Sequence, residues 1–146
     1  MKGKILFCSK EDVFEQNLDE FQVKLQITRY TKKGLLTGFI HAPGLSPSED
    51  LLNKTNHKWK KLIFTEFEQE KMTKGKTKTW WDLYTEQFEL EMSMNPEFIF
   101  NYCRLKEHLN NGNNIIACCY CDDYMKCHRS LIAKQLKAEG YEVILK

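Results

Sequence analysis

The segment 121–130 reads Cys-Asp-Asp-Tyr-Met-Lys-Cys-His-Arg-Ser and concentrates side chains that can act as nucleophile, proton carrier and anion ligand. It follows a short apolar run, 114–120, that predicts a strand buried on both faces. A helix is predicted directly after it, over 128–138. Ligands of parallel α/β sheets bind at the carboxyl ends of the strands, so we expect the working site in the loop 121–127.

The start of the predicted helix has the chemistry of an anion cradle. Unpaired amides and the helix dipole favour a negative charge there, and Arg129 and Ser130 add donors. The same field is expected to favour the thiolate of Cys127, as nucleophilic catalysis requires. His128 is then a proton carrier or a second anion contact, and Asp122 orients His128 or Arg129.

Two simpler interpretations stay open. Arg129 and His128 can face water on the first helical turn, and Asp122 and Asp123 can be ordinary loop acids or partners of Arg129. Cys121 and Asp122 are predicted to belong to the ligand-binding site. The choice between them depends on where the helix start points.

Metal and phosphatase chemistry are both disfavoured by spacing. Zinc ligands usually come in pairs separated by two to four residues, whereas Cys127 and His128 are adjacent, and adjacent helical side chains point about 100° apart. A phosphatase loop places five residues between Cys and Arg, and neither Cys121 nor Cys127 has that spacing to Arg129. We therefore predict no metal and no cofactor.

The remaining pattern predicts an open, mainly parallel α/β sheet with helices on both faces. Alternating or continuous apolar runs predict strands, and capped stretches with helical spacing predict helices. The predicted strands are 4–8, 21–29, 114–120 and 141–145, and the predicted helices are 9–18, 48–52, 80–92, 96–110 and 128–138. The run 62–72 fits a strand or a helix equally well.

Residues outside the loop can converge on the same sheet edge. Arg29 and Tyr30 end the second predicted strand, and two arginines at one edge would suit a polyphosphate or a nucleotide; the alternative is a surface arginine. His41 either covers the site or is exposed. Trp80 and Trp81 adjoin a lysine-rich loop and offer weak support for nucleic-acid binding, against a core role for most of the aromatic residues that follow.

Composition excludes several classes of protein. The 146 residues suit a single domain, and a net charge of +2 gives no general case for a nucleic-acid coat or a membrane surface. No apolar run approaches the roughly 18 residues needed to span a bilayer, and the N-terminus lacks the apolar core of a signal peptide. We expect a cytoplasmic chain whose six cysteines form no disulfides.

The run Ile-Ile-Ala-Cys-Cys-Tyr-Cys-Asp-Asp-Tyr-Met-Lys-Cys-His-Arg-Ser, 115–130, resembles the C-terminal signature of the family called domain of unknown function 488 (DUF488). Asn95-Pro96 before a helix and Arg29-Tyr30 before a proline-containing loop are similar as well. The resemblance implies a compact α/β fold and carries the family's Cys-His-Arg onto 127–129. It leaves the strand-end cysteine as Cys119 or Cys121, and Asp122 stands where many members have Glu.

Three functions remain open at this point. The first is an enzyme on a nucleotide or nucleic-acid-related substrate that uses the Cys127 thiolate, with Arg129 holding an anionic group. The second is a module that binds the same small anionic ligand without turnover. The third, less supported, is an interaction role through the basic and aromatic segment 54–81. The pattern does not determine the oligomeric state.

Overall fold

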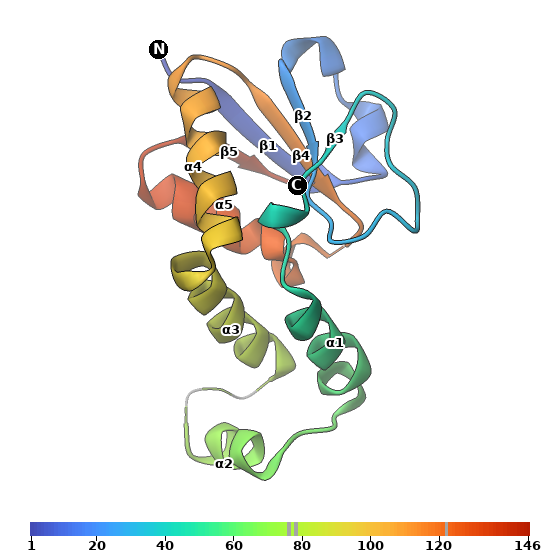
Figure 1. Cartoon of the computed structure of the whole chain (residues 1–146), viewed down its shortest axis with the longest axis vertical. Coiled ribbons are helices and arrows are strands. Elements are labelled where there is room, and N and C mark those ends of the chain that lie inside the picture. The colour runs from blue at the N-terminus through green and yellow to red at the C-terminus, as the bar shows by residue number, and fades with distance from the viewer. Residues whose placement is uncertain (76, 78, 122) are drawn as a thin grey trace.

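A parallel sheet organises the chain in the computed structural model, which describes residues 1–75, 77, 79–121 and 123–146 (Figure 1). Within these ranges the strands are β1 (Lys4–Ser9), β2 (Val23–Gln26), β3 (Ile40–His41), β4 (Ile115–Cys119) and β5 (Glu142–Leu145). They lie in the order β3-β2-β4-β1-β5, and every neighbouring pair is parallel. The expected fold class is therefore confirmed.

The two inner strands are the most apolar part of the chain. All five residues of β4 are buried, and so is every residue of β1 after Lys4. Strands covered on both faces lose water on both faces, which is why they read as continuous apolar runs rather than alternating ones. This packing also places Cys119, the last residue of β4, inside the protein at the carboxyl edge of the sheet.

Helical segments cover both faces of the sheet. The α-helices are α1 (Glu49–His57), α2 (Glu66–Lys74), α3 (Trp80–Met94), α4 (Pro96–Asn110) and α5 (His128–Ala138). On one face, apolar residues of α4 and α5 share a buried cluster with Ile5 and Phe7. The opposite face is covered more thinly, because Leu6 and Ile116 cluster with residues of short turns, Val13 and Phe21. The 3-10 helices span Asp12–Glu15, Leu18–Glu20, Pro43–Leu45, Trp59–Lys61 and Tyr124–Lys126.

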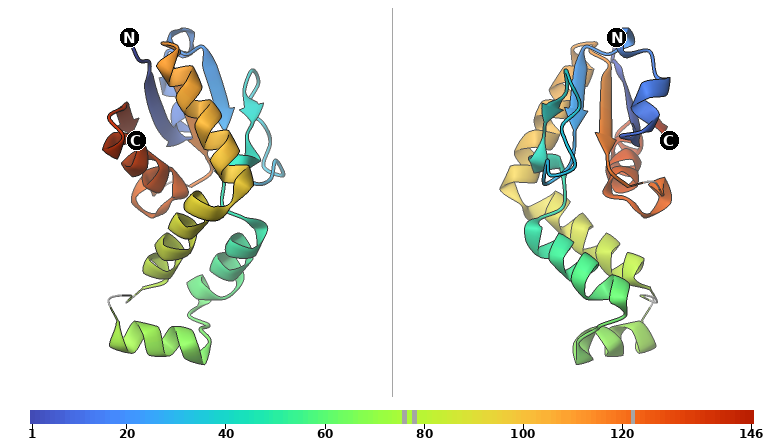
Figure 2. Two further views of the ribbon diagram at one scale, coloured as in Figure 1. Left: turned by 60° about the vertical axis from the view of Figure 1, so that its left-hand side comes forward. Right: turned by 90° about the vertical axis from the view of Figure 1, so that its right-hand side faces the viewer.

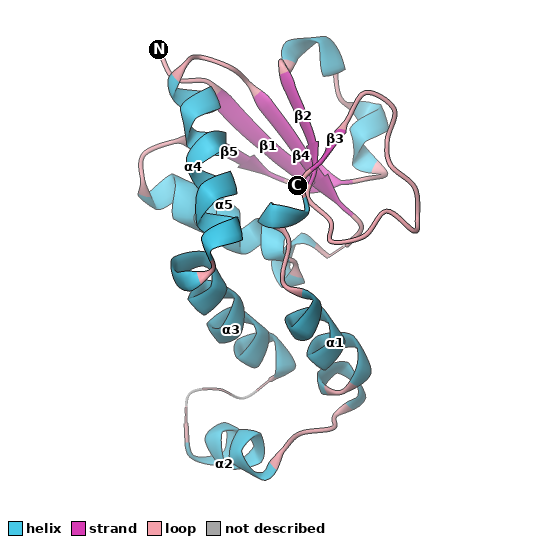
Figure 3. Ribbon diagram, in the orientation of Figure 1, coloured by secondary structure: helices cyan, strands magenta, loops and turns pink. Residues whose placement is uncertain are grey.

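The helices α1, α2 and α3 extend away from the sheet beyond the carboxyl ends of its strands (Figure 2). Figure 3 shows that this extension is helical and that the strands gather at the other end of the molecule. The ambiguous run 62–72 contributes α2, which starts at a capping box between Thr65 and Glu68. No residue of α2 is buried, so the capping box, rather than burial of an apolar face, marks where this helix begins.

Two predicted elements differ from the structure. The expected helix over 9–18 is replaced by two short 3-10 turns, and the strand expected over 21–29 ends at Gln26. The chain leaves the strand there because the Thr28 hydroxyl donates to the carbonyl oxygen of Tyr30, 2.9 Å away, which bends the backbone. In the described ranges, no helix has the length and apolar character that crossing a bilayer requires.

Candidate active site at the carboxyl ends of β2 and β4

Three thiols meet where β4 ends and α5 begins. The Sγ atoms of Cys119, Cys121 and Cys127 all lie within 4.8 Å of one another, and those of Cys119 and Cys127 are 3.1 Å apart. Cys127 occupies the N-cap of α5 in an extended conformation, so its side chain turns back toward the strand end. The sequence left the strand-end cysteine as Cys119 or Cys121, and the structure brings both of them to Cys127.

Arg129 lies beneath this cluster rather than on the surface. Its side chain is fully buried, with Nε donating to the main-chain oxygen of Lys146 at 3.2 Å. Its Nη1 atom donates to the carbonyl oxygen of Cys121 at 2.6 Å and lies 3.0 Å from Cys119 Sγ. The direct contact with a ligand that the sequence suggested for Arg129 is therefore wrong for this structure, because α5 directs the guanidinium inward between strand end and C-terminal segment.

The negative charge of the cluster is favoured on Cys121. Hydrogen bonds from Cys119 and Cys127 lower the pKa of the Cys121 thiol, and the positive charge of Arg129 acts in the same direction. The hydrogen bonds that Cys119 gives raise its own pKa, and burial raises the pKa of Cys127 to about 12. Of the three, only Cys121 is exposed. The pKa of Cys127 is raised because its burial outweighs the effect of the helix N-terminus, so the thiolate expected there is favoured at Cys121 instead.

His128 is committed to contacts inside the protein. Its Nε2 atom lies 2.7 Å from the carbonyl oxygen of Ile27, and its Nδ1 atom lies 3.6 Å from Cys127 Sγ. Burial lowers the pKa of His128, which favours the neutral ring with the proton on Nε2. Both ring nitrogens therefore contact groups inside the protein.

A cavity of about 320 Å³ opens beside the thiols. Its wall contains all three cysteines and His128, whereas Arg129 and Ser130 are not among its lining residues. Ser130 instead donates from its hydroxyl to the carbonyl oxygen of Cys127 at 2.7 Å. The described cations that line the cavity are Arg29, Lys32, Lys33, Lys60 and Lys126. No Asp or Glu is found among the described lining residues, so the electrostatic field in the cavity attracts anions.

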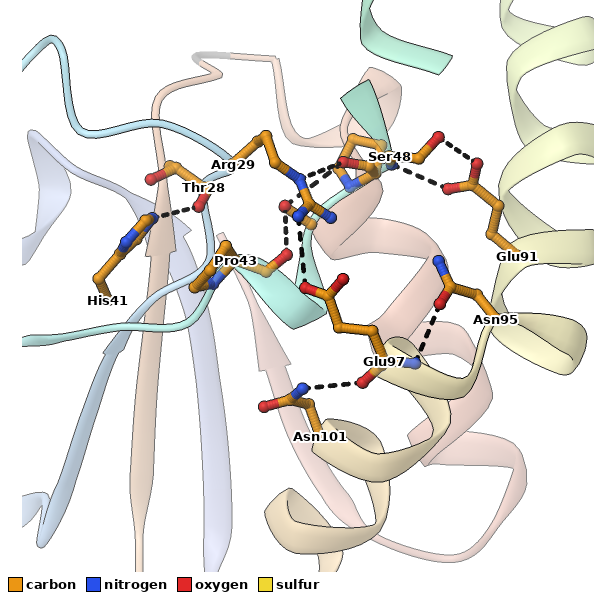
Figure 4. Close-up of polar contacts among 11 residues, drawn as sticks. Thr28, Arg29, His41, Pro43, Ser48, Glu91, Asn95, Glu97 and Asn101 are labelled. Atoms are coloured by element: carbon orange, nitrogen blue, oxygen red, sulfur yellow. Dashed lines mark hydrogen bonds and ion pairs between the residues drawn. The ribbon is translucent and has the colours of Figure 1, made fainter. Parts of the chain in front are cut away.

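Arg29 is held in place at the cavity wall. Its Nε donates to the carbonyl oxygen of Pro47 at 3.1 Å, and its Nη1 lies 3.3 Å from Glu97 Oε1 (Figure 4). The neighbouring Tyr30 lines the same cavity. The expected convergence of Arg29 and Tyr30 on the cysteine loop is thus present in the structure. His41 does not cover this cavity, because its ring bonds the Thr28 carbonyl oxygen at 2.6 Å and faces α4 instead.

Aromatic rings also line the cavity. Trp80 and Tyr84 of α3 contribute one wall, and Tyr120 follows β4 directly. The Tyr120 hydroxyl lies 3.0 Å from the Gly34 carbonyl oxygen, which ties the loop after β2 to the end of β4. The sequence pattern does not single out Tyr120 as a site residue, although its position directly after a buried strand is a signal for one. Asp122, predicted as a site residue, lies outside the described residues.

The three thiols also have the separation needed to hold a soft metal ion such as zinc. The sequence argument against zinc assumed that Cys127 is part of the helix. Cys127 is instead an N-cap residue with an extended backbone, so that argument does not apply to it. A fixed guanidinium 3.0 Å from Cys119 Sγ opposes a dication at this position, however, and stabilises a bare thiolate. The charge distribution therefore favours thiol chemistry.

Comparison with protein families gives one match, to a family described as the active DUF488-N3 subclade, over residues 19–140. The chain belongs to the DUF488 family. The match to DUF488 spans every residue that lines the cavity, as well as Arg129. Comparisons of this DUF488 protein with curated proteins and with solved structures found no match.

Proposed function

We propose that this DUF488 protein is a thiol-dependent enzyme that acts on a nucleotide or a nucleic-acid-related substrate, with the Cys121 thiolate as nucleophile. The observation that carries the proposal is the exposed Cys121 thiol on the wall of a cavity lined by cations and, among described residues, by no carboxylate. An active thiolate beside an anion-attracting cavity is the arrangement that covalent catalysis on a phosphate-bearing substrate needs. The family description, which names an active subclade, agrees with it.

The lining of the cavity supports a nucleotide in particular. Arg29 and Lys126 offer charge-assisted donors to phosphate oxygens, and Trp80 offers a face or edge to a base. Lys60 Nζ lies 5.0 Å from the Trp80 ring centroid, so cation and aromatic ring already share one wall. A volume of about 320 Å³ is at the small end of ligand pockets, which suits a nucleotide better than a larger substrate.

The cluster supplies the nucleophile without a separate base. Because Cys119 and Cys127 donate hydrogen bonds to Cys121, its thiolate is present before substrate arrives. Cys121 Sγ then forms a bond to the electrophilic atom of the substrate as the leaving group departs with its electron pair. The oxygen of a water molecule then bonds to the same substrate atom and gives a proton to solvent, the bond to sulfur breaks, and Cys121 is restored as a thiolate. Arg129 acts through Cys119 and the Cys121 carbonyl oxygen, as a positioning residue.

A second candidate is a module that binds the nucleotide without turnover. The placement of His128 favours it, because both ring nitrogens contact groups inside the protein and neither is directed to a ligand as a proton carrier. Both candidates use the same cavity and the same cations. They differ only in what Cys121 does.

The test combines binding and turnover with one panel of nucleoside mono-, di- and triphosphates. Calorimetry measures affinity, and mass spectrometry of nucleotide and intact protein measures products and adducts on Cys121. Arg29→Ala is expected to weaken binding by about 1.5–3 kcal/mol, the range for hydrogen bonds to charged groups. The exposed Arg104 of α4 provides the matched control, Arg104→Ala.

Cys121→Ser separates the two candidates. If the protein is an enzyme, this variant binds with nearly unchanged affinity but forms neither product nor adduct. Binding by the wild-type protein with no product and no adduct for any nucleotide of the panel would establish the binding module. Absence of nucleotide binding at low salt would exclude both candidates.

A further inference from the structure

The thiol cluster contains more cysteines than a single nucleophile requires. Cys121 is exposed, whereas Cys119 and Cys127 are 1% and 2% exposed and lie behind it. An accessible thiolate next to buried thiols is the arrangement found where a thiol is oxidised and then resolved by a neighbour. The remaining described cysteines do not offer this arrangement, because Cys8 and Cys118 face each other in a buried pair and Cys103 is exposed on α4.

We propose that Cys121, Cys127 and Cys119 form a hydroperoxide-reactive relay that ends in a Cys119–Cys127 disulfide and switches off the Cys121 nucleophile. The proposal rests on the reactive thiolate of the proposed function, but not on its nucleotide ligand. It assigns a redox role to the two buried thiols that the catalytic scheme uses only as hydrogen-bond donors.

The first step consumes one hydroperoxide. Cys121 Sγ attacks the terminal oxygen, the O–O bond breaks, and the departing alkoxide or hydroxide takes a proton to leave as alcohol or water. Cys121 is now a sulfenic acid. The Cys127 thiol attacks its sulfur, the S–O bond breaks, water leaves, and a Cys121–Cys127 disulfide forms.

Cys127 rather than Cys119 is the first partner because of chain geometry. One residue separates Cys119 from Cys121, so a disulfide between them would close a small, strained ring. Cys127 is reached through a longer loop, and its Sγ is already within 4.8 Å of that of Cys121.

The second step transfers the disulfide inward. Cys119 Sγ lies 3.1 Å from Cys127 Sγ. It attacks Cys127 Sγ and gives its proton to water, the Cys121–Cys127 S–S bond breaks, and Cys121 departs as a thiolate, which leaves the Cys119–Cys127 disulfide. Thiols of low pKa leave fastest in thiol–disulfide exchange, and Cys121 is the member of the cluster with the lowered pKa. An external dithiol reverses the change. It reduces the Cys119–Cys127 disulfide by two electrons and is itself oxidised to a disulfide.

The product removes what activates Cys121. Cys119 and Cys127 stabilise its thiolate with their S–H groups, and neither sulfur keeps a proton in the disulfide. The pKa of Cys121 should therefore rise on oxidation. Because the fold of β4 and α5 already holds the two buried sulfurs together, this requires little movement of the backbone.

The experiment treats the full chain with one equivalent of hydrogen peroxide, blocks free thiols with an alkylating agent and digests with trypsin. Cleavage after Lys126 and Arg129 isolates Cys127 in a three-residue peptide, and cleavage after Lys106 and Lys126 releases the peptide 107–126 with Cys118, Cys119 and Cys121. Fragmentation of the linked peptides then locates the bonded cysteine. The expected product joins the two peptides through Cys119. Cys103→Ser, which removes the exposed thiol of α4, should give the same product at the same rate.

Three variants resolve the order of events. Cys119→Ser should stop at the Cys121–Cys127 disulfide, Cys127→Ser should leave a sulfenic acid on Cys121 that dimedone traps, and Cys121→Ser should slow disulfide formation about tenfold or more. Thermal melting of each reduced variant shows that it is folded. Wild-type protein that forms no linked peptide, or that links the peptides equally fast without Cys121, overturns the relay.

Failure of the relay and failure of the proposed function are distinguishable. Selective alkylation of Cys121 by iodoacetamide reports the reactive thiolate directly, with no peroxide. Alkylation without a linked peptide would refute the relay and leave the proposed function standing. A linked peptide in a protein that binds no nucleotide would support the relay and refute the proposal that the ligand is a nucleotide.

Discussion

The Nη1 atom of Arg129 lies 3.0 Å from the Sγ atom of Cys119, with the guanidinium fully buried. None of the ion pairs between described residues includes Arg129, so the thiol cluster and main-chain oxygens are its identified partners. A buried cation requires compensating negative charge or dipoles. This contact therefore links the stability of the fold to the thiol cluster.

Arg129→Lys should destabilise the protein by about 3 kcal/mol, because an ammonium cannot satisfy the separate acceptors that the guanidinium reaches. Urea unfolding followed by circular dichroism measures the change. Arg104→Lys, at an exposed position of α4, is the matched control and should stay within about 0.5 kcal/mol of wild type. Equal urea midpoints for Arg129→Lys and Arg104→Lys would show that the buried contacts of Arg129 contribute little to stability.

Alkylation of Cys121 should depend only weakly on pH. The hydrogen bonds from Cys119 and Cys127 lower its pKa, so its thiolate persists as pH falls below the range where ordinary thiols protonate. The rate with iodoacetamide should change less than about threefold between pH 6 and 8, whereas that of glutathione falls about tenfold per pH unit. The measurement uses a Cys103→Ser background. A glutathione-like slope would remove the basis for a preformed thiolate.

Stability should fall in alkali because of the buried thiol of Cys8. Burial raises its pKa from 9.0 to about 11, so below pH 9 both folded and unfolded states keep the proton. Between pH 9 and 11 only the unfolded state loses it, and the free energy of unfolding falls by about 1.4 kcal/mol per pH unit from this thiol. Cys8→Ala should make the slope shallower by that amount.

Leu6→Ala provides the control for Cys8→Ala. Leu6 belongs to the same buried cluster as Cys8, so its truncation lowers stability without removing a titrating group. Its curve of unfolding free energy against pH should be displaced but keep the wild-type slope. If Leu6→Ala also changed the slope of unfolding free energy against pH, the alkaline effect would reflect general destabilisation of the core rather than titration of Cys8.

Ser48→Ala should cost about 1–2 kcal/mol, because Ser48 caps α1 and also bonds Glu91 of α3 through both its amide and its hydroxyl (Figure 4). Chemical denaturation measures the loss. Thr65→Ala removes an equivalent cap from α2, which buries no residue, and should leave the main transition almost unchanged. Similar losses for both would mean that α2 is more firmly attached than its exposure indicates.

The local elements near the site were predictable because their signals are short-range. Burial on both faces makes 114–120 continuously apolar, and Asn95 before Pro96 marks the start of α4 through its cap. The run 62–72 was not decided by its pattern, since α2 buries no face that could impose a period. The local hydrogen bond from the Thr28 hydroxyl to the Tyr30 carbonyl oxygen, which a periodic pattern does not reveal, accompanies the early end of β2 at Gln26.

The amino-acid sequence was enough to locate the candidate site, because a buried strand, a cysteine-rich loop and a helix start are all encoded by neighbouring residues. It could not decide which cysteine carries the charge or where Arg129 points. The Cys121 thiolate depends on burial of Cys119 and Cys127 and on hydrogen bonds among the three sulfurs. Those quantities arise only when β4, α5 and the C-terminal strand pack together, so only the tertiary structure distinguishes the three thiols.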